Sequence, residues 1–427
     1  MKHISKIWHT LFIGERPSLS LGLFRIAVAF TTWAHVYPSL VHLKDNYFPG
    51  AFKTVNTNFF PVETIHWIQE SPEWLIVVFC YIFCFSCFTF FIGLFTQISC
   101  LAMTISCYFF YALNAFHIGT LSWDILLVNL FLMCVTSYPG DYFSVDALRK
   151  GGGLNYGRER PYFIQRLLQL NIASIFFYTA LYKTTGGGNW IAENPLFNVL
   201  NYPSAGVTKT FLLKDYLINH PRLVYWIGVT VFLAEFYLPL FLFWRKTRIG
   251  AIYLGALFHV VLILTLDVPA TFLFLFPAQL CLFIDTRKIV DWIEVKRQRN
   301  KTLPLGHVLF DGKCYFCCAC VRWLKIMDMF QVIKFVDFNQ VSDLKQYHSM
   351  LTKEKVLAQM QLIDVKGGIY SGFYAFRRLS LWLPMLWPLL LVFYIPAAGF
   401  IGSVIYGIIA RNRHKLIKCN SSNTCRL

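Results

Sequence analysis

The sequence predicts an all-α polytopic membrane bundle of about eight transmembrane helices, followed by a small C-terminal α/β domain. Three observations lead to this prediction. The 427 residues are 56% hydrophobic and only 14% charged, whereas a soluble domain carries about 25% charged residues. Apolar runs of roughly twenty residues, the length that a bilayer core demands, recur through the first two thirds of the chain. Near residue 286 the composition changes, and a basic amphipathic stretch begins.

The apolar runs place the membrane helices and predict their orientation. The expected helices span 20–42, 73–95, 98–116, 121–138, 163–183, 222–244, 249–266 and 268–285. Eight spans leave both chain ends on one side, and Lys and Arg collect in cytoplasmic segments. The N-terminal segment 1–18 and the loops after the fourth, sixth and eighth helices are basic. We therefore expect a multi-pass protein, in the plasma membrane if the source is bacterial, with cytoplasmic N- and C-termini and no cleaved signal peptide.

The net charge of +17 is consistent with this topology. Nucleic-acid binding is another cause of such an excess, but basic cytoplasmic loops explain it more simply. We expect the lipid bilayer as the first partner and no nucleic-acid partner.

The membrane domain is expected to end at residue 286, followed by a basic linker over 287–304 and the C-terminal domain over 305–427. The expected elements of that domain are strands at 305–310, 332–337, 358–364 and 369–372 and helices at 315–328 and 340–357. The apolar stretch 382–409 contains three prolines. Because proline interrupts helices, we expect helices on the bilayer surface here; a ninth or tenth span is the alternative.

Cysteines form the first candidate site. Cys314-x-x-Cys317 follows a predicted strand and opens a predicted helix, where the helix N-terminus stabilises a thiolate. The second cysteine, one turn later, can resolve a mixed disulfide. We expect a cycling catalytic dithiol and no metal. The alternatives are inert thiols or a zinc site. Such a zinc site would draw further ligands from Cys318, Cys320, Cys419 and Cys425.

Seven other cysteines lie in predicted membrane helices: 80, 84, 87, 100, 107, 134 and 281. Cysteine in such helices usually packs as a small hydrophobe, which is the expected role here. A redox role for the group formed by Cys80, Cys84 and Cys87 is the alternative.

Three blocks of the C-terminal part, DGKCYFCCACVRWLKIMD, MQLIDVKGGIYSGFYAFRRL and VIYGIIARNRHKL, resemble the DCC family of thiol-disulfide oxidoreductase-like domains. The resemblance covers about 305–416. It implies a thioredoxin-like fold, an active Cys314–Cys317 pair in the Asp-x-x-Cys-x-x-Cys motif that begins at Asp311, and a thioredoxin-like reductant as a partner. No proline precedes the strand expected at 358–364, where thioredoxins place one beside the dithiol.

Lys183 forms the second candidate site. It ends an apolar run, and YTALYKTTGGGNW continues into three glycines and Trp190. A lysine here is explained by snorkelling to the interface. The neighbouring aromatics, Tyr178 and Trp190 among them, instead indicate a pocket. Shielding from water favours the neutral amine, which acts as a general base; we therefore expect Lys183 to be catalytic, with Tyr178 and Trp190 binding substrate or cofactor.

Three further polar residues interrupt predicted spans: Arg25, Glu235 and His259. Burying a charge in the bilayer costs about 3 kcal/mol or more, so such groups pair or function. An Arg25–Glu235 ion pair and a substrate-binding role are equally compatible with the sequence. His259 is either a hydrogen-bonded core histidine or part of the pocket.

In order, LGLFRIAVAF, DYFSVDALRK, YTALYKTTGGGNW, AEFYLPLFLF and GALFHVVLIL resemble the horizontally transferred transmembrane (HTTM) domain, shared with vitamin K-dependent γ-glutamyl carboxylases. The resemblance covers about 15–286. It implies that Lys183 is the base that deprotonates a hydroquinone cofactor.

These features together predict an integral membrane redox enzyme, in which a carboxylase-like bundle uses Lys183 on a quinol-type cofactor or a small secreted peptide. The alternative is a non-catalytic maturation or chaperone factor for a secreted peptide, with the cysteines as a thiol oxidoreductase or metal site. The expected topology puts Lys183 and the dithiol on opposite faces. Direct thiol exchange across about 30 Å of hydrocarbon is excluded, so coupling requires a diffusing quinone or the intramembrane cysteines.

Overall fold

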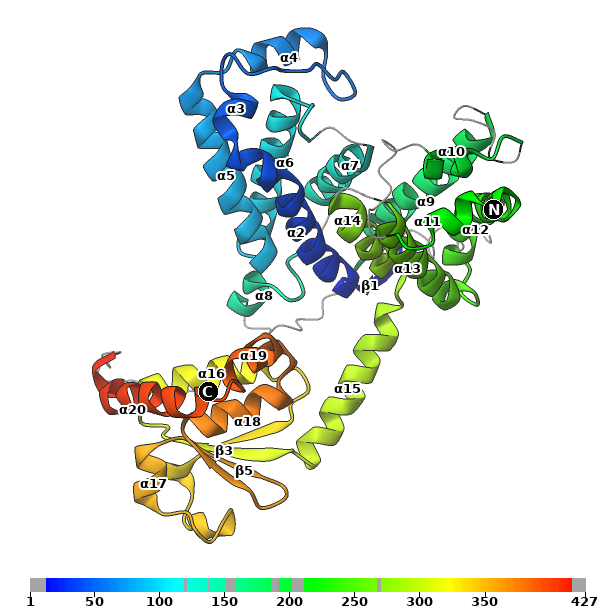
Figure 1. The fold of residues 1–427 in the computed structure, drawn as a ribbon. Coiled ribbons are helices and arrows are strands. Elements are labelled where there is room, and N and C mark those ends of the chain that lie inside the picture. Colours follow the sequence, from blue (N-terminus) through cyan, green and yellow to red (C-terminus); the bar gives the residue numbers. More distant parts are fainter. Residues whose placement is uncertain are drawn as a thin grey trace. The chain divides into compact units, whose positions relative to one another are not determined.

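The computed structural model describes residues 13–118, 121–136, 138–150, 159–185, 190, 192–201, 211–266 and 270–416. The chain forms two units. Unit 1 comprises Met1–Arg149 and Tyr156–Thr286, and unit 2 comprises Lys150–Asn155 and Arg287–Leu427. Each is described by itself (Figure 1).

Unit 1 is mostly helical, and each of the eight expected helices is present to within a few residues. They are α2 (Leu19–Val41), α5 (Glu73–Ile92), α6 (Thr96–Leu113), α7 (Leu121–Thr136), α9 (Phe163–Thr185), α12 (Pro221–Phe243), α13 (Arg248–Thr265) and α14 (Ala270–Leu280). Within the described ranges, five of these are long and apolar enough to cross a membrane: α2, α5, α6, α12 and α13. The helices α7 and α14 are shorter, and Arg166 and Lys183 interrupt the apolar character of α9.

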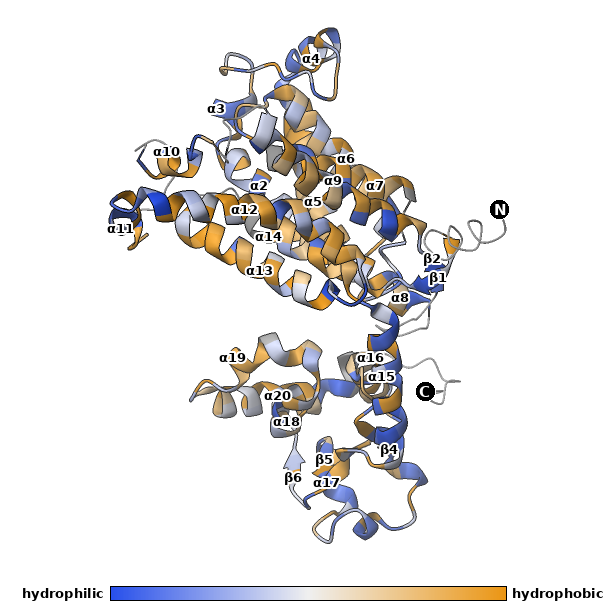
Figure 2. Ribbon diagram, turned by 90° about the vertical axis from the view of Figure 1, so that its right-hand side faces the viewer, coloured by the Kyte–Doolittle hydropathy of each residue, from blue (hydrophilic) through white to orange (hydrophobic). Residues whose placement is uncertain are grey.

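The outer surface of unit 1 carries many exposed apolar side chains. Along α5, Phe83 and Phe90 are fully buried, whereas Tyr81 and Phe85 are at least 70% exposed. A helix that is hydrophobic all round is typical of a membrane span. The hydrophobic colouring continues around the helices of this unit (Figure 2). We therefore describe the chain as a multi-pass membrane protein.

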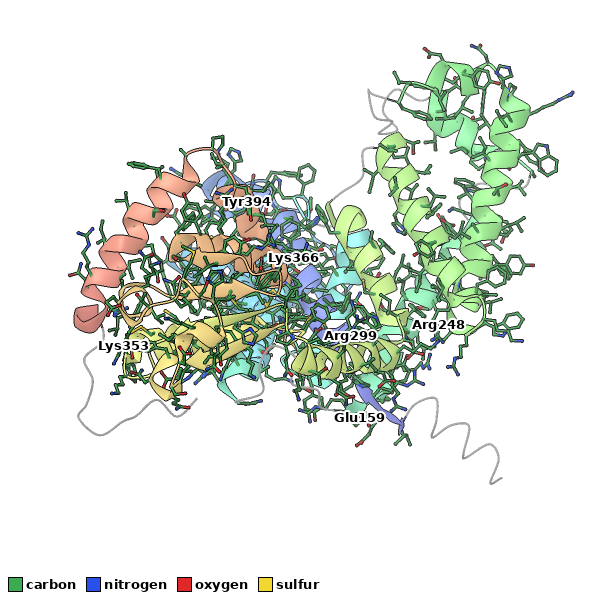
Figure 3. All side chains as sticks on the ribbon, turned by 90° about the horizontal axis from the view of Figure 1, so that it is seen from below. Glu159, Arg248, Arg299, Lys353, Lys366 and Tyr394 are labelled. Carbon is green, nitrogen blue, oxygen red and sulfur yellow. A yellow bond between two sulfur atoms is a disulfide. The ribbon has the colours of Figure 1, made fainter. Side chains whose placement is uncertain are left out.

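Short elements connect the helices. These are α3 (Leu43–Tyr47), α4 (Val62–Gln69), α8 (Val145–Arg149), α10 (Pro195–Asn201) and α11 (Lys214–Ile218). Two strands that were not predicted, β1 (Glu15–Pro17) and β2 (Glu159–Pro161), pair antiparallel. Both have the sequence Glu-Arg-Pro. The helix junction after α12 is closed by Arg248, whose guanidinium donates to the Leu242 and Phe243 carbonyls (3.0 and 3.2 Å); Arg248 is labelled in Figure 3.

Arg25 does not pair with Glu235, so the ion-pair expectation is wrong. The Arg25 side chain is fully buried. Its guanidinium donates to the carbonyls of Pro139 (2.8 Å), Tyr142 (3.3 Å), Phe143 (2.6 Å) and Phe91 (3.4 Å). It therefore joins α2 to the end of α5 and to the segment before α8. Backbone carbonyls at helix ends and in connecting segments offer hydrogen-bond acceptors that the residue types in the sequence do not reveal.

The basic stretch expected as a linker forms a helix, α15, and a mixed α/β domain follows it. The elements of unit 2 are α15 (Thr286–Thr302), β3 (Gly306–Phe310), α16 (Tyr315–Met327), β4 (Ile333–Asp337), α17 (Lys353–Ala358), β5 (Gln361–Asp364), β6 (Ile369–Ser371), α18 (Phe373–Trp382), α19 (Leu390–Phe393) and α20 (Ala398–Leu416). The sheet order is β4-β3-β5-β6. Strand β3 is parallel to β4 and antiparallel to β5, and β5 is antiparallel to β6.

The alternation of β3 builds two cores. Val308 packs with Leu324 of α16 and Leu379 of α18 on one face of the sheet. Leu309 packs with Val356 of α17 on the other. Successive strand residues point to opposite faces, so one short strand serves both layers.

The single helix expected at 340–357 is wrong. The segment instead contains the 3₁₀ turns η3 (Phe338–Gln340) and η4 (Leu344–Gln346), and then α17. The side chains of Asp337, Asp343 and Thr352 accept backbone N–H groups at the starts of η3, η4 and α17, respectively. Each side chain accepts a backbone N–H that, in a continuous helix, would be bonded to a carbonyl of the preceding turn. A new turn therefore begins at each of these residues.

The apolar stretch after α18 breaks into η5 (Pro384–Leu389), α19 and α20. None of these is among the candidate spans found in the described part of the chain. Tyr394, labelled in Figure 3, ties the end of α19 to α18: its hydroxyl donates to the Arg377 carbonyl (3.2 Å), and its ring lies 4.3 Å below the Arg377 guanidinium.

Candidate functional site

Cys314 and Cys317 form a disulfide at the start of α16. Cys314 is the N-cap residue of this helix, and its sulfur accepts the backbone N–H of Cys317 (3.2 Å). The free N–H groups of a helix N-terminus favour negative charge. When the bond is reduced, this position therefore stabilises a thiolate on Cys314.

The loop before Cys314 is held by side-chain hydrogen bonds. The Asp311 carboxylate accepts the Lys313 backbone N–H (3.0 Å) and the Asn339 amide (2.9 Å), and the Asp311 carbonyl accepts the Cys314 N–H (3.2 Å). Asp337 accepts the Gly312 N–H (2.9 Å). The ends of β3 and β4 thus fix where α16 begins.

The two sulfurs of the disulfide differ in accessibility. Cys314 is 1% exposed, whereas Cys317 is half-buried. Cys317 lines a cavity of about 160 Å³. The other walls of this cavity are mostly apolar and come mainly from α16, α18, α20 and the residue before β5; they include Phe316, Cys320, Met360, Phe376, Tyr406 and Ile409. A reactant therefore reaches the disulfide through Cys317.

Met360 occupies the place before β5 where the sequence lacks a proline. Its N–H donates to the Tyr406 hydroxyl of α20 (3.1 Å), and its carbonyl accepts the Gly372 N–H (3.0 Å). Both backbone groups are already bonded, so this position offers no hydrogen bonds to an incoming strand.

Replacing Gly312 with alanine should loosen the dithiol loop. A Cβ there would lie 2.1 Å from an Asp337 carboxylate oxygen, which would force that side chain away from its partners. We expect a loss of about 1–3 kcal/mol in stability, measured by denaturant unfolding. The matched control is Gly407→Ala in α20, where the nearest atom is 3.7 Å from the new Cβ. Equal stability of the two variants would contradict this account.

Lys183 is paired with Glu235. The Lys183 ammonium donates to the Glu235 carboxylate, joining α9 to α12, and both side chains are largely buried (13% and 9% exposed). A carboxylate in contact with an amine stabilises the charged amine. The structure therefore gives Lys183 a buried carboxylate partner, which the sequence did not predict.

Trp190 covers this pair. Its backbone N–H donates to the Lys183 carbonyl (3.0 Å), and its ring centroid lies 4.6 Å from the Lys183 nitrogen. The indole packs beside Gly228, seven residues before Glu235 on α12. A cation over an indole face adds attraction. The three glycines between Lys183 and Trp190 lie outside the described residues.

The other predicted site residues, Tyr178, His259 and Arg25, have their own contacts away from the Lys183–Glu235 pair. Tyr178 is 68% exposed and stacks on Tyr182. His259 is buried, donates to the Gly255 carbonyl (2.7 Å) and packs against Phe176 and Phe276. Phe176 lies seven residues before Lys183, or about 10 Å along the helix. His259 therefore has the contacts of a core histidine, and Arg25 belongs to the carbonyl network described above.

Comparison with known families agrees with these two units. Residues 15–292 match the family model of the HTTM domain, which covers more than half of the chain. The chain belongs to the HTTM domain family. Residues 308–419 match the DCC1-like thiol-disulfide oxidoreductase model, so the HTTM chain carries a DCC1-like domain at its C-terminus. Both resemblances derived from the sequence are confirmed. No curated protein and no solved structure matches the chain.

Some functional features of the HTTM chain were missed at the sequence level. The cavity beside Cys317 depends on Tyr406 and Ile409, about ninety positions along the chain. The i, i+3 spacing of Cys317 and Cys320, which places both thiols on one helix face, is a signal from which part of this cavity could have been found. Among the described residues no group of three or more His, Cys, Asp or Glu side chains is placed to hold a metal; Cys419 and Cys425 lie outside them.

Proposed function

We propose that the chain is an integral membrane redox enzyme in which Cys314 and Cys317 cycle between disulfide and dithiol. The observation that carries this proposal is the Cys314–Cys317 bond at the N-terminus of α16 inside a DCC1-like domain. The sheet order β4-β3-β5-β6 supports a thioredoxin-like fold for this domain.

The exposure of the two sulfurs sets the order of events. A substrate thiolate attacks Cys317, the sulfur that lines the cavity, and forms a mixed disulfide. The S–S bond breaks and Cys314 leaves as a thiolate that the helix N-terminus stabilises. A second substrate thiolate then releases Cys317. Two electrons and two protons pass from the substrate thiols to the protein, and a substrate disulfide forms.

The hydrogen bonds of the Met360 backbone bear on which substrates the domain can bind. Because the Met360 backbone is already bonded within the domain, we expect recognition to rely on the apolar cavity beside Cys317. We therefore favour a small apolar thiol, or one apolar side chain next to a cysteine, over an extended peptide. In the opposite direction, a thioredoxin-like reductant would reduce the disulfide.

Substitution of either cysteine should abolish this exchange. With the full chain in lipid nanodiscs and dithiothreitol as reductant, Cys314→Ser and Cys317→Ser should each reduce turnover of a small aliphatic disulfide at least about a hundredfold. Cys281→Ser, whose half-buried thiol lies in unit 1, is the control. In reduced protein, maleimide should label Cys317 of Cys314→Ser faster than Cys314 of Cys317→Ser. Turnover that survives in the double variant would refute the proposal.

For unit 1 we propose eight membrane spans, with cytoplasmic N- and C-termini. The helices α7, α9 and α14 would complete the set.

In unit 2, the exposed apolar side chains of α19 and α20, including Leu391 and Phe400 at 83% and 78% exposed, support a membrane-associated C-terminal face.

The Lys183–Glu235 pair supports a second proposal, a proton-transfer site for a quinol-type cofactor or a peptide substrate. A bound quinol supplies an acidic hydroxyl. Of the two paired residues, the carboxylate of Glu235 has lone pairs that can accept a proton, whereas the ammonium of Lys183 has none. Lys183 then stabilises the negative charge that remains, and Trp190 shields the pair from water. The alternative is a non-catalytic maturation factor for a secreted peptide, which predicts that substituting either residue has little effect on function.

A further inference from the structure

Two cysteines on neighbouring membrane helices bring their sulfurs into contact. Cys134 on α7 donates its S–H to the sulfur of Cys100 on α6, at 3.1 Å. A disulfide bond is about 2.05 Å long, so the two sulfurs need to approach by only about 1 Å. The pair is separate from Cys80, Cys84 and Cys87.

The surroundings of the pair include a polar group that contacts one of its sulfurs. The Thr104 hydroxyl lies 3.0 Å from the Cys134 sulfur, while it also donates to the Cys100 carbonyl (2.8 Å). The Cys100 thiol is fully buried. Simple packing would place apolar atoms around both sulfurs, whereas here a hydroxyl and a second thiol contact Cys134.

Cys134 opens onto a large apolar cavity, of about 980 Å³, between α5, α6, α7 and the segment that includes α4. Cys100 does not line it. Aromatic rings dominate the walls: Phe59, Phe60, Trp67, Phe79, Tyr108, Phe109 and Phe131. One sulfur of the pair is thus reachable from a space that suits a flat, apolar molecule, and the other sulfur is shielded behind it.

We propose that Cys100 and Cys134 form a second redox dithiol, which a membrane-soluble quinone oxidises from this cavity. The two S–H bonds break and one S–S bond forms between Cys100 and Cys134. The quinone takes up the two electrons and two protons and leaves as a quinol, so the reaction balances without another reactant. This activity is independent of the Cys314–Cys317 exchange.

The test uses full-length protein in which Cys314, Cys317, Cys318, Cys320, Cys419 and Cys425 are all replaced by serine, so that only the seven thiols of the helical unit remain to react. The reduced protein in nanodiscs is mixed anaerobically with a ubiquinone that bears one isoprene unit. We expect about one quinol per chain, followed by its absorbance. Digestion without reductant and mass spectrometry should show a peptide pair joined through Cys100 and Cys134.

Added Cys100→Ser or Cys134→Ser should abolish both signals, and added Cys281→Ser should leave them unchanged. Val128→Trp keeps both thiols but fills the cavity that Val128 lines. It should slow oxidation by the quinone about tenfold or more while the small oxidant diamide still joins the cysteines. Absence of the Cys100–Cys134 peptide with both oxidants would overturn the dithiol. If the Cys100–Cys134 peptide formed with diamide but not with the quinone in protein that keeps Val128, oxidation by a quinone would be refuted. The cavity would then be a site filled by lipid.

Discussion

Replacing Lys183 with methionine is expected to destabilise the helical unit by about 3–5 kcal/mol, because it leaves the buried Glu235 carboxylate without a partner. Only 9% of the Glu235 side chain is exposed. The double substitution Lys183→Met/Glu235→Leu removes both charges and should recover most of this loss. Unfolding of the detergent-solubilised protein, followed by tryptophan fluorescence, measures both effects.

Lys246→Met is the matched control for this comparison. Lys246 is exposed in the connection between α12 and α13, and its substitution should change stability by less than about 0.5 kcal/mol. If Lys183→Met/Glu235→Leu were as unstable as Lys183→Met, the unpaired Glu235 carboxylate would not be the cause of the lost stability. A double variant that is stable yet inactive in proton-transfer assays would instead assign chemistry to the pair and exclude the non-catalytic alternative.

The positions of the helices could be predicted because a chain in hydrocarbon must satisfy its backbone internally, so every apolar run of sufficient length becomes a helix. Which helices are neighbours could not be predicted in the same way. The partner of Glu235 depends on whether α12 faces α2 or α9, and a helix that is apolar all round carries no periodic mark of its buried face. An Arg25–Glu235 pair was therefore as compatible with the sequence as a substrate-binding role, while the structure places Glu235 against Lys183.

In the C-terminal unit the local signals were stronger. The strand before Cys314 and the helix after it follow from the short apolar run that ends in Val308, Leu309 and Phe310 and from the cysteine at the helix cap. The helix expected at 340–357 is wrong because Asp343 and Thr352 act as caps for separate turns. The cavity beside Cys317 was beyond prediction because α20 closes it from far along the chain.

Arg25 should be the most sensitive position in the helical unit. Arg25→Met removes hydrogen bonds to four carbonyls, on Phe91, Pro139, Tyr142 and Phe143. Each bond from a charged donor contributes about 1.5–3 kcal/mol, and the acceptors lie at the ends of different segments. We expect a loss of about 4 kcal/mol or more, measured as above, together with faster proteolysis between α7 and α8.

Arg25→Lys separates charge from geometry in this network. A lysine keeps the positive charge but has a single nitrogen in place of the guanidinium fork, so it should recover only part of the loss. The control on the same helix is Ser20→Ala, since the buried Ser20 hydroxyl makes no hydrogen bond within the described part of the chain. If Arg25→Lys were as stable as the native protein, charge alone would suffice. The joining of α2 to α5 and to the segment before α8 by a planar donor would then be refuted, because only a fork can reach acceptors on both α5 and that segment.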